Sequence, residues 1–173
     1  MAAAAPAPVN ATAAALLGLL HRGPATGGQL IALAEHRYGG FFGVTRSQVY
    51  RELPVLAEQG LLRLGKQGAR ASQSYVITAA GKRAFRSWLA ADSGATADAV
   101  RSPLLLRLVH AGELTDAERT RLVVQAREVL AQRLIDAKAA AATADGPYAV
   151  AVAEFAVAHA RAVAKVVERV ARV

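Results

Sequence analysis

The residues best suited to chemistry lie between Thr45 and Arg51, where hydroxyl, amide, phenol and guanidinium groups follow one another. Thr45 with Gln48 three residues later fits a capping box, which predicts a helix starting at Arg46. A helix with a polar and basic first turn is typical of those that enter a DNA major groove. Gln48 is expected at a base edge, since a glutamine can pair with adenine through two hydrogen bonds, and Tyr50 at the phosphate backbone.

A basic hairpin is predicted after this helix. Residues 61–64 and 74–77 resemble two strands around a glycine-flanked loop, residues 65–73, which predicts contact with phosphates or a minor groove. An ordinary solvated hairpin is the alternative. The predicted DNA contacts are Thr26, Thr45, Arg46, Ser47, Gln48, Tyr50, Arg51, Lys66, Gln67 and Arg70.

Helices predicted from apolar spacing and caps would hold these residues in place. A first helix is expected from Asn10 or Thr12 to about His21, and a second from Thr26 to about Tyr38. In the third, the apolar side chains recur at intervals of four and three residues and predict the buried stripe, which consists of Val49, Leu53 and Leu56. Phe41 and Phe42 are predicted to plug the core beneath the third helix, and a fourth helix is predicted from Thr78 onward.

The second half of the chain predicts a helical dimerisation region. A short helix is expected from Pro103 to about Ala111, and a long one from Thr115 to about Ala142, with a stripe of Leu122, Ala126, Val129, Leu130, Leu134 and Ala137. A last helix follows Gly146-Pro147, and its apolar side chains form a coiled-coil-like seam of Tyr148, Val152, Phe155, His159, Ala162 and Val166. Two such helices leave apolar surface uncovered, which predicts packing against a second subunit.

Composition and charge narrow the function further. The net charge is +8, of which residues 1–90 carry +7 and residues 91–173 carry +1, so a polyanion-binding module is expected in the first half. The chain has no cysteine, and its four histidines lack metal-ligand spacing. Neither a catalytic constellation nor a phosphate loop is found, so no enzyme, metal or cofactor is predicted. A cytoplasmic protein is expected, because no apolar run is long enough to span a membrane.

Several motifs together resemble one family. They are Gln48-Val49-Tyr50-Arg51-x-Leu53-x-x-Leu56-x-x-x-Gly60-Leu61, Tyr75-x-Ile77-Thr78-x-x-Gly81, Leu16-Leu17-Gly18-Leu19-Leu20 and Gly23-Pro24-x-x-Gly27. In this order and spacing the chain resembles the PadR family of bacterial winged helix-turn-helix transcriptional regulators. The resemblance implies a homodimer that binds a palindromic operator in double-stranded DNA, usually as a repressor, and releases it when a small molecule, often aromatic, binds near the dimer interface.

The chain departs from the family pattern at several positions. Gly28 stands where the family often has tyrosine, Thr26 where histidine is common, and Gln48 where serine is usual. Pro54 and Val55 replace residues that are usually polar or basic, and Pro54 is expected to bend its helix. The base contacts of this chain are therefore expected to differ from those of its relatives.

The predicted fold is mainly helical with a small β-hairpin. Its parts are a disordered segment, residues 1–12, a winged helix-turn-helix domain, residues 13–90, a linker, residues 91–102, and a helical dimerisation and effector domain, residues 103–173. The candidate effector-binding residues are Phe85, Trp88, Tyr148, Phe155 and His159, although core or dimer packing is the competing interpretation for each. Two other functions remain open: a winged-helix protein-interaction scaffold, and a small-molecule-binding helical protein without specific DNA binding.

Overall fold

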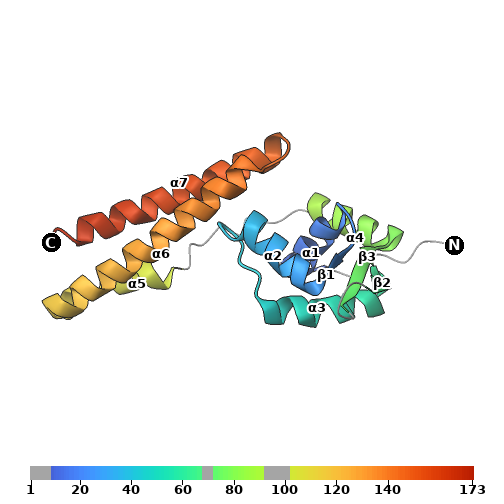
Figure 1. The fold of residues 1–173 in the computed structure, drawn as a ribbon, viewed down its shortest axis with the longest axis horizontal. Helices are drawn as coiled ribbons and strands as arrows, with labels where there is room; N and C mark the ends of the chain where they lie inside the picture. Colours follow the sequence, from blue (N-terminus) through green and yellow to red (C-terminus); the bar gives the residue numbers. More distant parts are fainter. Residues whose placement is uncertain (1–8, 68–71, 92–101) are drawn as a thin grey trace. The chain divides into compact units, whose positions relative to one another are not determined.

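A computed structural model describes residues 9–67, 72–91 and 102–173, and the chain divides into two compact units, Met1–Gly94 and Ala95–Val173. Figure 1 shows helices in both units, and in the described residues a small antiparallel sheet lies in the first unit. The predicted class, mainly helical with a small β element, is confirmed. The predicted linker, residues 91–102, lies almost wholly outside the described residues.

Four helices and three strands are formed by the described residues of the first unit. In chain order they are α1 (Ala11–Leu20), β1 (Ala25–Thr26), α2 (Gly27–Tyr38), α3 (Arg46–Glu58), β2 (Leu62–Gln67), β3 (Gln73–Ile77) and α4 (Ala79–Ala90). Residues 11 and 12 are helical, so the expected disordered segment cannot extend to residue 12, and its first eight residues lie outside the described part. Helix α3 continues through Pro54 as a single element.

Each of these helices begins with a side-chain cap, as the sequence predicts. The side chains of Asn10, Thr26, Thr45 and Thr78 accept hydrogen bonds from backbone N–H groups in the first turns of α1, α2, α3 and α4. A cap of this kind contributes about 1 kcal/mol, because it satisfies a donor that has no partner within the helix. The positions where the helices start are therefore fixed locally.

Strand β3 is the central strand of the sheet, which has the order β1-β3-β2. Ala25 pairs with Tyr75 on one side, and Leu64 pairs with the same Tyr75 on the other. The register between β2 and β3 shifts between Leu64 and Gln67, and β2 runs three residues further than predicted. Strand β1 has only two residues, and no sequence pattern predicts it.

The core of the first unit is made largely of leucine. Its fully buried large side chains come from α1, α2 and α3, and they are Leu16, Leu17, Leu20, Leu30, Val49, Leu53 and Leu56. Truncating such a leucine to alanine typically costs about 2–5 kcal/mol. The predicted stripe of α3 is therefore confirmed. The prediction for Phe41 is wrong, because this residue is 47% exposed and its ring makes a T-shaped contact with the ring of Tyr38, with centroids 6.0 Å apart.

Among its described residues, the second unit contains a 3₁₀ helix, η2 (Ala111–Glu113), and three α-helices, two of them long. The α-helices are α5 (Pro103–Val109), α6 (Asp116–Ala142) and α7 (Pro147–Val170), and α6 and α7 lie side by side in Figure 1. A capping box of Thr115 and Glu118 starts α6, and its hydrogen bonds lower the pKa of Glu118. Arg127 donates two hydrogen bonds of 2.7 Å to Glu168, which lower the pKa of that carboxyl.

Helix α7 has two adjacent apolar faces. The face packed within the unit carries Ala156, Ala160, Val163 and Val167, all buried. The predicted seam lies on the neighbouring face and stays accessible, with Tyr148 88% and Phe155 55% exposed. On α6 the predicted stripe is confirmed at Ala126, Leu130 and Ala137, which are buried, but is wrong at Val129, which is exposed. Val123, which is not part of the predicted stripe, is buried.

None of the described helices combines the length and apolar character needed to cross a lipid bilayer.

Candidate nucleic-acid interface

Helix α3 presents a polar, basic face away from the core. Val49, Leu53 and Leu56 are buried on one side, whereas Arg46, Ser47, Tyr50 and Arg51 are exposed on the other. Tyr50 is 51% exposed, and the side chain of Arg51 is 70% exposed. The structure therefore brings four of the predicted contacts together on one face of α3, where their side chains can reach a partner without unfolding the helix.

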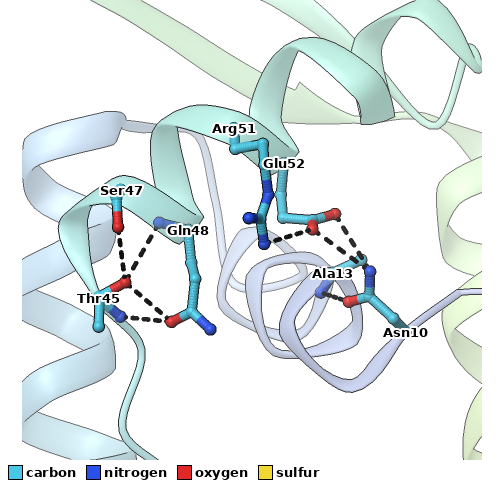
Figure 2. A network of polar contacts seen from close by, with 7 residues as sticks. All are labelled: Asn10, Ala13, Thr45, Ser47, Gln48, Arg51 and Glu52. Atoms are coloured by element: carbon cyan, nitrogen blue, oxygen red, sulfur yellow. Dashed lines mark hydrogen bonds and ion pairs between the residues drawn. The ribbon is translucent and has the colours of Figure 1, made fainter.

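The start of α3 is held by a hydrogen-bond network shown in Figure 2. The backbone N–H of Gln48 donates to Thr45 Oγ1 at 3.3 Å, and the backbone N–H of Thr45 donates to the side-chain oxygen Gln48 Oε1 at 2.8 Å. Thr45 Oγ1 also donates to Gln48 Oε1 at 3.0 Å and lies 3.1 Å from Ser47 Oγ. Gln48 is thus half-buried and joined to its own helix cap.

This network limits how Gln48 can read a base. Pairing with adenine through two hydrogen bonds needs both the amide oxygen, as acceptor, and the amide nitrogen, as donor. Because two donors from Thr45 already engage Oε1, only Nε2 can reach a partner while the cap stays closed. Gln48 remains a predicted base contact, but as a donor to an acceptor such as a purine N7 or a guanine O6.

Helix α2 begins with the same kind of capping box. Thr26 accepts from the N–H of Gln29 at 3.3 Å, and Gln29 Oε1 accepts from the N–H of Thr26 at 2.8 Å. The next residue, Gly27, lies under Tyr50, since an added Cβ there would stand 2.9 Å from Tyr50 Cε1. The absence of a side chain at Gly27 therefore sets where the Tyr50 ring rests.

The contact between Gly27 and Tyr50 gives a first prediction. Gly27→Ala is expected to weaken DNA binding by roughly fivefold, the equivalent of one net hydrogen bond of ~1 kcal/mol, because the added methyl group displaces the Tyr50 ring. The fold should tolerate the change, since that ring is partly exposed and able to move. Fluorescence anisotropy and thermal unfolding check the two effects. Gly28→Ala is the control, because an added Cβ there meets nothing within 4 Å, and equal affinities for both variants would contradict the prediction.

The wing is shaped by an irregularity in the pairing of β2 with β3. Gln73 Nε2 donates to the carbonyl of Gly65 at 2.9 Å, and Ser74 Oγ donates to the carbonyl of Lys66 at 2.6 Å. A bulge of this kind redirects the side chains beside it, and Lys66 is exposed there. Arg70 lies outside the described residues, as does the placement of the Gln67 side chain.

Sequence reasoning missed Glu52, the one buried charged residue in the described part of the chain, at 9% exposure. Its carboxylate accepts from Asn10 Nδ2 at 3.3 and 3.4 Å and lies 3.8 Å from Arg51 Nη2. A signal was present, because position 52 falls on the apolar stripe of α3, between Val49 and Leu53. Its partner Asn10 is 42 residues away, which no local pattern reveals.

The candidate effector residues lie in different settings. In the first unit, Phe85 packs partly buried on the core beside Gly18 and His21, whereas Trp88 is 40% exposed. In the second unit, Phe155 stacks on His159 with ring centroids 5.9 Å apart, and Tyr148 lies on the same exposed face. None of the five lines the shallow cavity of about 400 Å³ between the start of α6 and the end of α7.

Comparison with known proteins identifies the first unit. Residues 16–87 match the family model described as the transcriptional regulator PadR-like family. The negative transcriptional regulator PadR of Bacillus subtilis (strain 168) is 32% identical over 78 residues, and the alignment spans 43% of each protein, less than half the length of either.

Solved structures match the fold over most of the chain. Bacillus subtilis PadR in complex with operator DNA superposes with a TM-score of 0.70 at 22% identity, over 92% of this chain and 96% of that one. The same protein in complex with p-coumaric acid gives 0.64 at 20% identity, over 91% and 94%. Residues 16–87 of this chain, its winged-helix unit, are thus similar in sequence to the PadR-like family of transcriptional regulators.

Proposed function

We propose that the protein is a dimeric, sequence-specific DNA-binding regulator, most simply a repressor. The observation that carries the proposal is the exposed face of α3, where Arg46, Ser47, Tyr50 and Arg51 stand on a winged-helix unit similar to the PadR-like family. A similar fold is seen in complex with operator DNA in the Bacillus subtilis relative. In this proposal α3 enters the major groove and Lys66 on the wing holds a phosphate.

The second unit would supply the dimer contact. The accessible seam on α7, made of Tyr148, Val152, Phe155, His159, Ala162 and Val166, lies beside the face that packs within the unit. Large contiguous apolar patches are uncommon on monomers, because they expose area that association would bury. Two copies of α3 in a two-fold dimer would then meet half-sites about one helical turn, ~34–36 Å, apart on a palindrome.

The dimer contact gives a second prediction. Phe155→Glu is expected to shift the protein from dimer to monomer in sedimentation velocity, because it places a charge in the centre of the seam. Val150→Glu is the matched control, since Val150 is also partly exposed but lies on another face of α7. A Phe155→Glu protein that stays dimeric at micromolar concentration would remove the seam from the proposal.

A small molecule would release the operator by acting at the dimer interface. The Bacillus subtilis relative forms a complex with p-coumaric acid, which supports an aromatic ligand class. The candidate contacts on the seam are Tyr148, Phe155 and His159, and the separate candidates in the first unit are Phe85 and Trp88. A ligand that favours one spacing of the two recognition helices would weaken both half-sites at once. In this proposal the protein acts in the cytoplasm as a regulator and catalyses no reaction, and it needs no metal or cofactor.

Selection of DNA from a random pool tests the proposal directly. The full-length chain is mixed with duplexes carrying about 30 randomised base pairs, enough for two half-sites one turn apart, and bound duplexes are amplified and sequenced. A palindromic consensus is expected, bound at least ~10³-fold more tightly than a scrambled duplex, as measured by anisotropy. Enrichment of no sequence over the starting pool would refute specific DNA binding.

The wing gives a third prediction, for salt dependence. Lys66→Ala is expected to reduce the slope of log K against log salt by about one and to weaken binding to all sequences alike, since a phosphate contact carries no sequence information. Lys138→Ala, an exposed lysine of α6 in the second unit, is the control for a change of net charge alone. Equal slopes for the two variants would show that Lys66 does not meet a phosphate.

A further inference from the structure

Glu52 is a carboxylate buried in a place where an apolar residue would fit. It lies on α3 among Val49, Leu53 and Leu56, and only 9% of the residue is exposed. Burying a carboxylate is costly, and replacing buried charged groups with apolar residues of similar volume is often neutral or stabilising. Burial alone therefore does not explain why a carboxylate stands at this position, and its role is to be sought in what the carboxylate holds.

On one side the carboxylate is held by the start of α1. Asn10 donates from Nδ2 to both carboxylate oxygens, while its own Oδ1 accepts from the N–H of Ala13 at 2.8 Å. Asn10 is thus the cap of α1 and the partner of Glu52 at once, as Figure 2 shows. The first turn of α1 contains no acidic residue, so Glu52 places a negative charge near that positive helix end from another helix.

On the other side the carboxylate faces Arg51. Arg51 Nη2 lies 3.8 Å from Glu52 Oε1, and the arginine side chain is 70% exposed. An exposed ion pair of this length adds little to stability. It does bias the position of a long side chain that has about 2 kcal/mol of rotamer entropy, because the carboxylate is itself fixed by Asn10. The guanidinium therefore favours positions near Glu52, on the face of α3 that carries Ser47 and Tyr50.

We propose that Glu52 is a positioning residue that orients Arg51 for its contact with DNA, and that Asn10 fixes Glu52 for this task. The proposal rests on the DNA-binding function proposed above. An oriented guanidinium favours a base edge that needs one geometry, but gives no advantage on phosphates, which accept many geometries. The carboxylate charge also opposes phosphate binding. Glu52 therefore sets the preference for the operator over other DNA rather than the total affinity.

A double-mutant cycle tests the coupling between Glu52 and Arg51. Wild type, Glu52→Gln, Arg51→Ala and the double variant are each titrated with the selected duplex and with a scrambled duplex of equal composition. Glu52→Gln is expected to lower the ratio of the two affinities about tenfold, with binding to the scrambled duplex unchanged or tighter. In the Arg51→Ala background the same substitution is expected to change the ratio less than about twofold. Independent effects of the two substitutions would overturn the proposal.

Exchanging the hydrogen-bond donor at position 10 with the acceptor at position 52 distinguishes two roles of Glu52, the positioning of Arg51 and the support of the fold. Asn10→Asp alone sets two carboxylates against each other and is expected to lower the melting temperature. In the Asn10→Asp, Glu52→Gln double variant, the introduced aspartate can still cap α1 and accept a hydrogen bond from the introduced glutamine amide, so the melting temperature should recover. The affinity ratio should not recover, because no carboxylate faces Arg51 from position 52.

Each outcome decides between these interpretations. Recovery of the melting temperature and the affinity ratio together would mean that Glu52 only supports the fold, and would overturn the proposal. Should Glu52→Gln unfold, the exchanged pair still supplies a folded protein for the ratio. A wild-type protein that prefers no duplex would refute the proposed function itself. A wild type that prefers its selected duplex, with Glu52→Gln preferring it equally, would refute only the role of Glu52.

Discussion

Gly81→Ala is expected to destabilise the winged-helix unit by about 3 kcal/mol or more, near or above the upper end of the usual cost of overpacking. A Cβ at position 81 would overlap the carbonyl oxygen of Leu61 and stand 2.9 Å from Ile77 Cγ1. The carbonyl cannot move freely, because Thr78 donates to it from its backbone N–H at 3.0 Å and from its hydroxyl at 3.1 Å. Relief of the clash therefore breaks the junction between β2 and the start of α4.

Unfolding of this unit can be followed without interference from the second. The chain has a single tryptophan, Trp88, and it lies on α4. For a unit of this size the expected loss corresponds to a drop of about 12 °C or more in the melting temperature. Gly28→Ala is the matched control, because its Cβ would meet nothing within 4 Å, and it should stabilise by about 0.4–1 kcal/mol. Similar melting temperatures for Gly81→Ala and wild type would show that the junction adapts.

Gln48→Glu is expected to reduce operator affinity by about tenfold to a hundredfold, the usual range for losing a base contact, while leaving stability unchanged or raised. Glutamate at this position completes a capping box as well as glutamine does, and its charge suits a helix start. The substitution removes the Nε2 donor, the one amide group of Gln48 that the cap leaves available for a base. The affinity ratio between selected and scrambled duplexes should fall along with the affinity.

Gln29→Glu controls for the added charge. It makes the same chemical change at the same position of the capping box on α2, where no base contact is predicted. This variant should weaken binding to both duplexes by a similar factor and leave the ratio unchanged. If Gln48→Glu behaves in the same way, Gln48 contributes through electrostatics alone and touches no base.

The parts of the fold that local sequence predicts are the helix starts and the buried faces. Thr45 with Gln48, and Thr115 with Glu118, fix the starts of α3 and α6 within four residues of chain. The intervals among Val49, Leu53 and Leu56 are equally local, and all three side chains are buried. Such features depend on neighbours in the same helix, which is why sequence alone specifies them.

The features of the fold that local sequence does not predict depend on residues far apart in the chain. Strand β1 exists only because Ala25 and Thr26 pair with β3, about fifty residues later. The contact of Glu52 with Asn10 and that of Gly27 with Tyr50 also join different helices. On α7, spacing reveals apolar residues around much of the helix but not which face α6 covers, so the seam and the packed face could be separated only by the structure.

The capping box of α3 bears on how this protein could acquire a new target. A regulator changes its target by exchanging residues of its recognition helix, which in the proposed function is α3. Residue 48 holds the start of α3, and residue 52 ties α3 to α1. A random exchange at either position would alter folding together with any change in sequence preference. The side chains of Ser47, Tyr50 and Arg51 contribute less to capping α3 or to tying it to α1. New specificities should therefore arise first at these three positions, and changes at 48 should be confined to residues that can still cap.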